Sequence, residues 1–212
     1  MTVTFKSTLP NITKKFSLKI GMLFAKIPLT PNQWTIVSLI PAVAGFYFLT
    51  QHNMPYALFA FIVAAMADAI DGGVARVRGQ VTNFGAYLDG MTDRFVEAAL
   101  IFGLMFYGYA DWFLTGTMWL SMMLFFGTLM TAFSRAYADH RKAVTDPDAL
   151  AEMGGILERA ERMVLIFVSM ALTLVNPLYA TYLIAVVVAL AVATVAQRMW
   201  FTYRFSKSLD AR

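Results

Sequence analysis

DAIDGGVARVRGQVTNFGAYLDGMTD, residues 68–93, places four aspartates in one short window of a chain built mainly of long apolar segments. They are Asp68, Asp71, Asp89 and Asp93. A carboxylate at the centre of a membrane helix costs about 2.5–3.5 kcal/mol on insertion scales. Four carboxylates at helical spacing therefore need compensating positive charge, and divalent cations are natural candidates to supply it.

The composition places the chain among membrane proteins. Of its 212 residues, 59% are hydrophobic and only 14% are charged, which excludes a disordered chain and disfavours a soluble globular domain. There is no cysteine, so disulfides and Cys-ligated zinc are excluded. The net charge of +4 is expected to face anionic lipid headgroups, and we expect no nucleic-acid partner.

Six apolar segments reach about 20 residues, the length that crosses the hydrocarbon core as a helix. They lie near 33–51, 55–75, 84–108, 112–136, 157–175 and 178–203. We therefore expect an all-α membrane protein with six transmembrane helices, forming a single domain over residues 1–212. No internal repeat of the kind found in inverted-repeat transporters is evident.

Residues 11–27 precede the first span and are too short and too basic to cross a membrane. Their apolar residues share one helical face and their lysines lie off it, which predicts an amphipathic helix in the membrane interface. An ordinary solvated amphipathic helix would show the same pattern.

The positions of the basic residues test the number of spans. With six spans, all 17 Lys and Arg residues fall on one side of the membrane. The turns on the other side, 51–54, 107–111 and 175–177, carry none. The positive-inside rule then places both termini and the aspartates in the cytoplasm.

The spacing of the aspartates predicts a shared metal site. Asp68 and Asp71 are three residues apart, so they share a face at the end of the second span. Asp89 and Asp93 are four apart at the start of the third span. Carboxylate oxygens suit Mg²⁺, Mn²⁺ or Ca²⁺ rather than zinc, and a metal pair in a membrane indicates phosphoryl chemistry on a lipid. A single aspartate at a helix end, by contrast, is commonly a cap or a solvated charge.

The whole window satisfies the pattern D-x2-D-G-x2-A-R-x8-G-x3-D-x3-D. Its fixed positions are Asp68, Asp71, Gly72, Ala75, Arg76, Gly85, Asp89 and Asp93. This motif resembles the signature of the CDP-alcohol phosphotransferases, a family with six transmembrane helices and a short amphipathic N-terminal helix. The resemblance implies a homodimeric enzyme of phospholipid synthesis. Its donor would be a CDP-activated lipid, CDP-diacylglycerol or CDP-archaeol, and it would release CMP when an alcohol attacks.

The resemblance also implies roles for individual residues. Asp68, Asp71 and Asp89 would hold two divalent ions, Mg²⁺ or Mn²⁺, and Asp93 would contact metal and act as general base. The spacing alone does not choose the base among the four aspartates. The residues implied to bind CDP are Asn32, Asp68, Gly72, Ala75 and Arg76. Asn32 belongs to a Thr-Pro-Asn entry to the first span, which a helix N-cap followed by proline explains equally well.

A second basic set lies outside the motif and consists of Arg135, Arg159, Arg162 and Arg198. Arg159 and Arg162 share a helical face, and Arg198 lies in the last span, where an unpaired arginine is costly. Guanidinium groups fit phosphate oxygens, so the set predicts a cytoplasm-facing pocket for a second, phosphorylated substrate. Pairing with nearby acids at 139, 158 and 161, or with lipid headgroups, is the alternative.

This basic set is similar to the inositol-phosphate branch of the family. We therefore expect transfer of a phosphatidyl or archaetidyl group to inositol 1-phosphate, with glycerol 3-phosphate as the alternative acceptor. Three features depart from that branch: Arg135 stands where lysine is expected, Gly90 where serine is common, and the loop 144–155 is long.

A divalent-cation transporter is the alternative from another functional class, because acidic residues in spans also occur in cation pathways. We disfavour it because the charges gather on one side and the sequence places no acid at mid-depth on a path through the membrane. An inactive scaffold is disfavoured because all four aspartates are present.

Overall fold

The computed structural model describes residues 21–210, and every element in that part of the chain is a helix. In chain order the helices are α2 (Pro31–Val37), α3 (Leu39–Thr50), α4 (Met54–Arg78), α5 (Asn83–Tyr107), α6 (Gly116–Met122), the π-helical segment η2 (Met123–Met130), α7 (Thr131–His140), α8 (Pro147–Glu152), α9 (Arg159–Thr173) and α10 (Pro177–Asp210). The all-helical class predicted from the sequence is confirmed. Most of the predicted interfacial helix at 11–27 lies outside the described residues.

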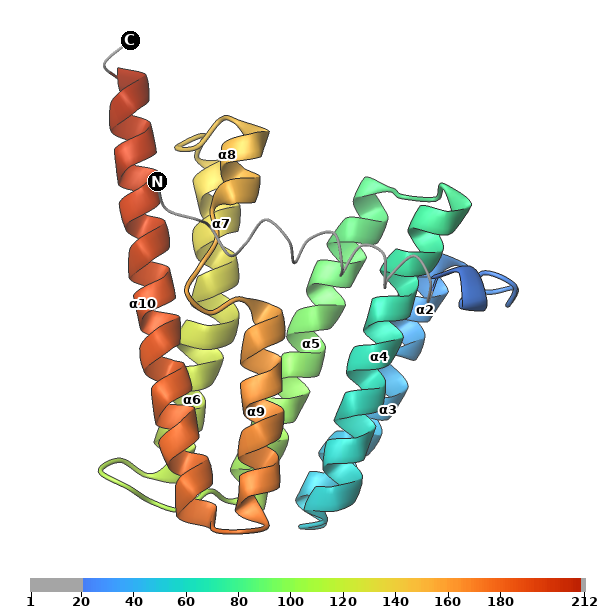
Figure 1. The fold of residues 1–212 in the computed structure, drawn as a ribbon, viewed down its shortest axis with the longest axis vertical. Coiled ribbons are helices and arrows are strands. Elements are labelled where there is room, and N and C mark those ends of the chain that lie inside the picture. Colours follow the sequence, from blue (N-terminus) through green and yellow to red (C-terminus); the bar gives the residue numbers. More distant parts are fainter. Residues whose placement is uncertain (1–20, 211–212) are drawn as a thin grey trace, which may run out of the picture.

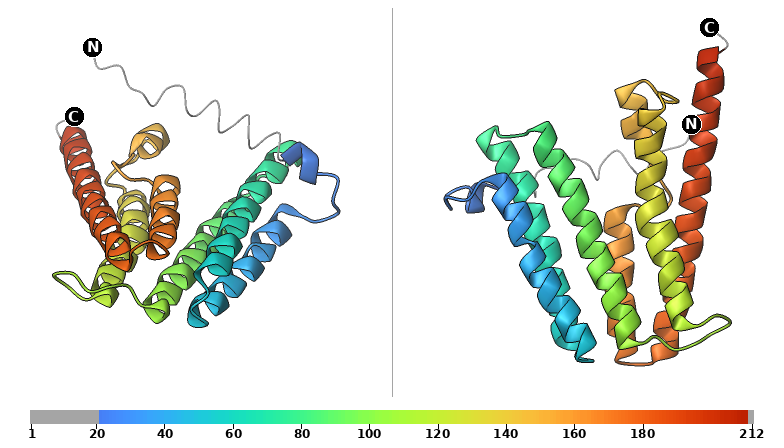
Figure 2. Two further views of the ribbon diagram at one scale, coloured as in Figure 1. Left: turned by 60° about the horizontal axis from the view of Figure 1, so that its bottom comes forward. Right: turned by 180° about the vertical axis from the view of Figure 1, so that it is seen from behind.

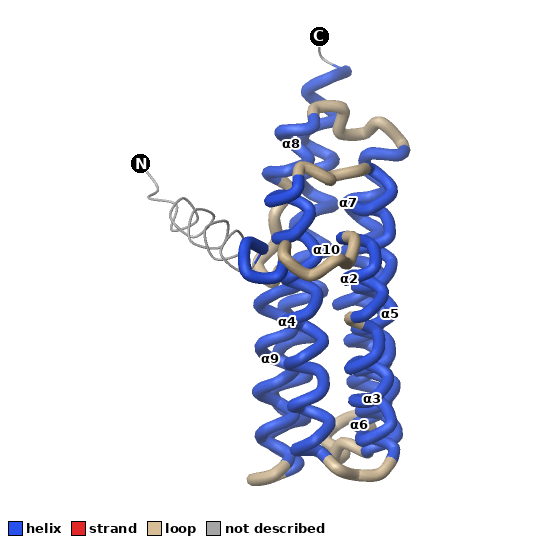
Figure 3. Tube along the Cα trace, turned by 90° about the vertical axis from the view of Figure 1, so that its right-hand side faces the viewer, coloured by secondary structure: helices blue, strands red, loops and turns tan. Residues whose placement is uncertain are grey.

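The long helices run side by side in two groups, α2–α5 and α6–α10 (Figure 1). The groups approach each other at one end and diverge toward the end that carries α8, which the two further views also show (Figure 2). Most connecting loops gather at the two ends of the bundle (Figure 3). The C-terminal half of α4 and the N-terminal half of α5 both lie toward the divergent end, so the aspartate window lies at that end of the bundle (Figure 1).

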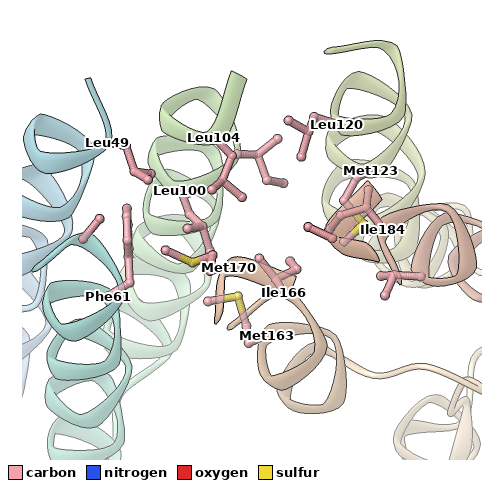
Figure 4. Packing of buried hydrophobic residues seen from close by; sticks show 14 of the residues in the cluster. Leu49, Phe61, Leu100, Leu104, Leu120, Met123, Met163, Ile166, Met170 and Ile184 are labelled. Atoms are coloured by element: carbon pink, nitrogen blue, oxygen red, sulfur yellow. The ribbon is translucent and has the colours of Figure 1, made fainter. Parts of the chain in front are cut away.

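Apolar side chains fill the end where the two groups meet. Leu49, Leu100 and Leu104 from the first group are fully buried, as are Met123 and Ile184 from the second (Figure 4). Between membrane helices such contacts stabilise the bundle through close van der Waals packing, because lipid tails are as apolar as these side chains. This end is thus held by hydrophobic packing, whereas the divergent end is left for polar groups.

Four helical stretches are long and apolar enough to cross a membrane: 31–50, 54–78, 116–140 and 177–207. The first joins α2 and α3, and the third joins α6, η2 and α7. Large apolar side chains point outward from several helices; Phe59, for example, is 67% exposed. The protein is therefore an integral membrane protein.

The largest differences from the predicted span boundaries are in the fourth span, which ends at His140, and in the last span. The span expected at 112–136 begins at Gly116, because residues 112–114 form a tight turn and Thr115 caps the helix by accepting a hydrogen bond from Met118 N at 3.2 Å. The last helix continues past residue 203 to Asp210.

Arg78 at the end of α4 holds the segment that precedes α2. Its guanidinium donates to the backbone carbonyls of Ala25, Ile27 and Leu29, each at 2.6 Å. Thr30 then begins α2 with a capping box to Gln33. The entry to the first span is thus fixed to the end of α4, beside the aspartate window.

Gly103 tests the packing of α3 against α5. A Cβ atom there would lie 2.6 Å from Leu49 Cδ1, whereas Gly90 on the same helix has nothing within 4 Å. Overpacking costs about 1–3 kcal/mol, so we expect Gly103→Val to lower Tm in detergent by roughly 2–12 °C. Gly90→Val, the matched control, should lower it less, because the added Cβ atom meets nothing there. Equal melting temperatures for the two variants would show that the α3–α5 contact tolerates the added side chain.

Candidate functional site

Three of the four aspartates form a compact group at the divergent end of the bundle. Asp68 and Asp71 come from α4 and Asp89 from α5, and each offers one carboxylate oxygen within 4.8 Å of the others. Three hard oxygen donors at this spacing fit a divalent cation of the Mg²⁺ or Mn²⁺ type. Of the four aspartates whose spacing predicts a shared metal site, these three are grouped in the structure.

Asp71 is the most firmly held member of this group. It is buried, its Oδ2 accepts a hydrogen bond from Thr35 Oγ1 at 2.5 Å, and its Oδ1 accepts one from Gly72 N at 2.5 Å. Thr35 lies on α2, so the first span orients a carboxylate of the second. This contact could not be predicted from the sequence, because the two residues are 36 positions apart and meet only through the packing of α2 on α4.

Asp93 is not part of this group of three but borders it beside Asp68, and it also pairs with Arg159. Arg159 Nη2 is 2.6 Å from Asp93 Oδ1, and Arg159 Nη1 is 3.0 Å from Asp68 Oδ2. The same guanidinium thus joins the two carboxylates. The remaining nitrogen of its fork, Nε, contacts Glu97 Oε1 at 3.1 Å.

Glu97 is a buried acid that the sequence interpretation overlooked. Its side chain is fully buried near the middle of α5, where Oε2 accepts from Arg162 Nη2 at 2.8 Å and from Thr128 Oγ1 at 2.7 Å. Arg94 Nη1 lies 3.4 Å from Oε1. Glu97 thus lies at mid-depth in a predicted span, but its partners enclose it, so it does not contradict the expectation that no acid stands at mid-depth on a path through the membrane. Because Arg159 and Arg162 neutralise Glu97, this acid belongs to a structural ion-pair network and is not an accessible site on an ion pathway.

A cavity of about 330 Å³ opens beside the aspartate group, between α2, α4 and α5. Four of the five residues expected to bind CDP line it: Asn32, Gly72, Ala75 and Arg76. Asp68 does not line this cavity, whereas Asp71 and Asp89 do. The structure adds Gln80 and Thr82, polar residues of the α4–α5 turn that the motif does not contain.

A second and larger cavity, of about 870 Å³, adjoins the first, and Ala86 lines both. All four arginines of the predicted phosphate pocket line it, namely Arg135, Arg159, Arg162 and Arg198. They come from α7, α9 and α10, so the tertiary fold has gathered a set that is scattered in sequence. The cavity is also lined by Arg94, which the sequence interpretation did not include.

Two further features border this second cavity. The long loop 144–155 contains the short helix α8, and Leu150, Met153 and Gly154 face the cavity. Arg198 donates a hydrogen bond to the carbonyl of Thr131, at the junction of η2 and α7. Wider π-helical turns often occur at functional sites, and here the turn places a carbonyl where Arg198 can reach it.

Two of the three acids expected to neutralise these arginines have other partners, whereas the third, Glu158, attracts the guanidinium of Arg198. Arg159 and Arg162 pair with Asp68, Asp93 and Glu97 on the facing helices. Asp139 lies 3.6 Å from Lys142, and the Glu161 carboxylate accepts from the backbone of Glu158 as part of the α9 capping box. Local pairing along α9 therefore does not account for its two arginines.

Comparison with known proteins points to one family. The model of the family described as CDP-alcohol phosphatidyltransferase matches residues 28–197. An archaetidylinositol phosphate synthase of Pyrococcus horikoshii is 34% identical over 79% of this chain and 82% of its own length. A phosphatidylinositol phosphate synthase of Corynebacterium glutamicum is 33% identical over 73% of this chain and 68% of its own.

The fold is also similar to that of a solved structure. The crystal structure of Mycobacterium tuberculosis phosphatidylinositol phosphate synthase with CDP-DAG bound has a TM-score of 0.74 to this chain at 22% identity. The similarity covers 89% of this chain and 94% of the other. At this level of identity the comparison supports the helical arrangement alone.

The hydrogen bond from Thr35 to Asp71 leads to a test of the aspartate group. Thr35→Val removes the donor and keeps the shape, so we expect Mn²⁺ to bind about 10-fold more weakly, as for other residues that orient metal ligands. Electron paramagnetic resonance of free Mn²⁺ in titrations of the purified protein measures this. Thr50→Val, whose hydroxyl donates only to the carbonyl of Tyr47, is the control. Equal affinities in both variants would remove Thr35 from the site.

Proposed function

The chain belongs to the CDP-alcohol phosphatidyltransferase family, and we propose that it transfers a phosphatidyl or archaetidyl group from a CDP-activated lipid to inositol 1-phosphate, releasing CMP. The observation that carries this proposal is the arginine-lined cavity beside the aspartate group. The donor brings its own pyrophosphate to the first cavity. A separate set of guanidinium groups therefore fits an acceptor that carries a phosphate of its own. The two relatives named above are synthases of inositol phosphate lipids.

We assign the metal-binding role to Asp68, Asp71 and Asp89, with Asp93 completing the set. Two divalent cations, Mg²⁺ or Mn²⁺, would neutralise the pyrophosphate and stabilise the departing CMP phosphate. The compact group of three carboxylates supports this assignment, because without a cation these like charges would repel one another.

Asn32, Gly72, Ala75 and Arg76 would hold the CDP moiety in the first cavity, with Asp68 close to its phosphates. A Cβ atom at Gly72 would lie 3.1 Å from Arg76 Nη2, so the glycine makes room for the guanidinium, and its carbonyl accepts a hydrogen bond from Arg76 Nε at 2.9 Å. That bond keeps the Arg76 fork near the phosphate position. These residues provide binding and orientation, which are the main protein contributions to phosphoryl transfer.

Asp93 would act as the general base. It lies between the aspartate group and the second cavity, where Arg159 fixes its orientation. In the reaction the acceptor hydroxyl gives its proton to the Asp93 carboxylate, and the alcohol oxygen bonds to the lipid-side phosphorus. The bond between that phosphorus and the bridging oxygen breaks, and CMP leaves. Arg135, Arg159, Arg162 and Arg198 would hold the acceptor phosphate.

For the membrane arrangement we propose six spans in one domain, an interfacial N-terminal helix, and a homodimer. Four spans satisfy length and composition alone. α5 equals α4 in length, and its buried charges are paired inside the bundle, so they do not face lipid. α9 has 15 residues and lies parallel to the others (Figure 1). The one-sided distribution of Lys and Arg supports a cytoplasmic position for both termini and for the site.

CMP release by the purified protein with different acceptors tests the proposed reaction. The assay would contain CDP-diacylglycerol or CDP-archaeol with Mg²⁺ or Mn²⁺, and either inositol 1-phosphate, glycerol 3-phosphate, inositol or serine. We expect release with inositol 1-phosphate and none with inositol, because only the phosphorylated acceptor engages the arginines. Release with glycerol 3-phosphate alone would keep the chemistry and reject the acceptor, and Mn²⁺ flux into liposomes without any turnover would favour a transporter.

Asp93→Asn tests the general base. The amide keeps the shape but accepts no proton, so we expect turnover to fall about 10²–10⁴-fold, the usual contribution of general-base catalysis. Binding of the CDP-lipid, measured by equilibrium titration, should persist. Asp111→Asn at the opposite end of the bundle is the matched control, because asparagine can still accept the hydrogen bond from Gly116 N. Near-normal turnover in Asp93→Asn would move the base elsewhere.

A further inference from the structure

The guanidinium of Arg159 contacts three carboxylates, of which two belong to the proposed metal site and one is a buried structural acid. Its terminal nitrogens lie 3.0 Å from Asp68 and 2.6 Å from Asp93, two residues of the proposed metal set. Its Nε lies 3.1 Å from Glu97, which belongs to no proposed site. The arginine also lines the second cavity. One side chain therefore touches both the metal ligands and the proposed acceptor pocket.

The carboxylates that Arg159 contacts differ in how deeply they are buried and in how many other groups hold them. Glu97 is fully buried and is also held by Arg162 at 2.8 Å and Thr128 at 2.7 Å. The side chains of Asp68 and Arg159 are 21% and 30% exposed, respectively. The Nε end of the guanidinium is thus anchored on a fully buried carboxylate, whereas Nη1 contacts the partly exposed Asp68 and Nη2 contacts the more deeply buried Asp93.

Electrostatics then sets a competition for Asp68 and Asp93. A divalent cation bound to these carboxylates uses the same negative charge that attracts Arg159, and it repels the guanidinium at short range. A phosphate in the second cavity attracts the same guanidinium from the other side. Metal and acceptor therefore both favour an Arg159 that has turned away from the aspartates.

We propose that Arg159 and the divalent metal share Asp68 and Asp93, and that metal binding transfers the terminal nitrogens of Arg159 to the acceptor phosphate while Nε stays on Glu97. The identity of the acceptor in this inference rests on the proposed function. The inference makes Arg159 the link between the two cavities. Because linkage is reciprocal, metal and acceptor each strengthen the binding of the other by the same factor.

Mn²⁺ titrations of the full-length protein in detergent, without any substrate, test the shared carboxylates. We expect Arg159→Gln to bind Mn²⁺ about 5-fold more tightly or better, since the competing guanidinium is gone. The Mn²⁺ affinity of Arg159→Lys should fall between those of the unaltered protein and Arg159→Gln, because one ammonium group cannot contact both carboxylates. The control is Arg135→Gln, which removes the same charge from the second cavity. No ion pair joins Arg135 to the aspartates in residues 21–207, so Mn²⁺ affinity should stay within about 2-fold.

Unchanged or weaker Mn²⁺ binding in Arg159→Gln would overturn the inference and make Arg159 a fixed support of the aspartates. An equal gain in Arg135→Gln would overturn it as well, because the effect would then be one of general charge.

A second titration adds inositol 1-phosphate, with a protein-free series to correct for its own binding of Mn²⁺. We expect it to tighten Mn²⁺ binding to the unaltered protein about 5-fold or more and to have little effect on Arg159→Gln. If Arg159→Gln binds Mn²⁺ more tightly but inositol 1-phosphate changes nothing in the unaltered protein, the shared carboxylates stand and the proposed acceptor is wrong. The two hypotheses can thus fail separately.

Discussion

The pairing of buried carboxylates with the two arginines of α9 is the interaction on which the site depends. Glu97 sits fully buried in α5, and removing one partner of a buried charge pair typically costs about 3–5 kcal/mol. Its partners Arg159 and Arg162 belong to the other helical group, so the charge network joins the two groups where their apolar contacts end. The apolar packing near Leu104 and Ile184 closes the opposite end. The bundle can therefore open around the aspartates without coming apart.

This division explains why two cavities lie next to each other at one end. The first is bounded by helices of one group, and the second lies between that group and the arginines of α7, α9 and α10. Ala86, a small residue on α5, lines both. A donor in one cavity and an acceptor in the other would meet at Asp89 and Asp93, where the carboxylates stand. The two adjoining cavities between the helices would thus set how the substrates lie relative to each other.

Local spacing in the sequence predicted the aspartate group, because three- and four-residue intervals on a helix fix which side chains share a face. Guanidinium chemistry predicted that Arg135 and Arg198 would face one pocket, although only the fold brings their helices together. Thr35 and Glu97 could not be found this way. A threonine in an apolar span carries no signal, and the partners of Glu97 on η2 and α9 are far from it in the sequence. The span expected near residue 112 begins at Gly116, because residues 112–114 form a tight turn and Thr115 caps the helix, which hydropathy alone does not predict.

The order of functions along α5 follows from helix geometry. Asp89, Asp93 and Glu97 are spaced four residues apart, and each step advances about 6 Å along the axis and turns about 40° beyond a full revolution. The first acid therefore faces α4 and its aspartates, and the last faces Thr128 and the arginine Arg162. Asp93 lies between them in height and direction, within reach of Arg159. One gradually turning row of acids thus leads from the metal ligands through the proposed base to the anchor of the acceptor arginines.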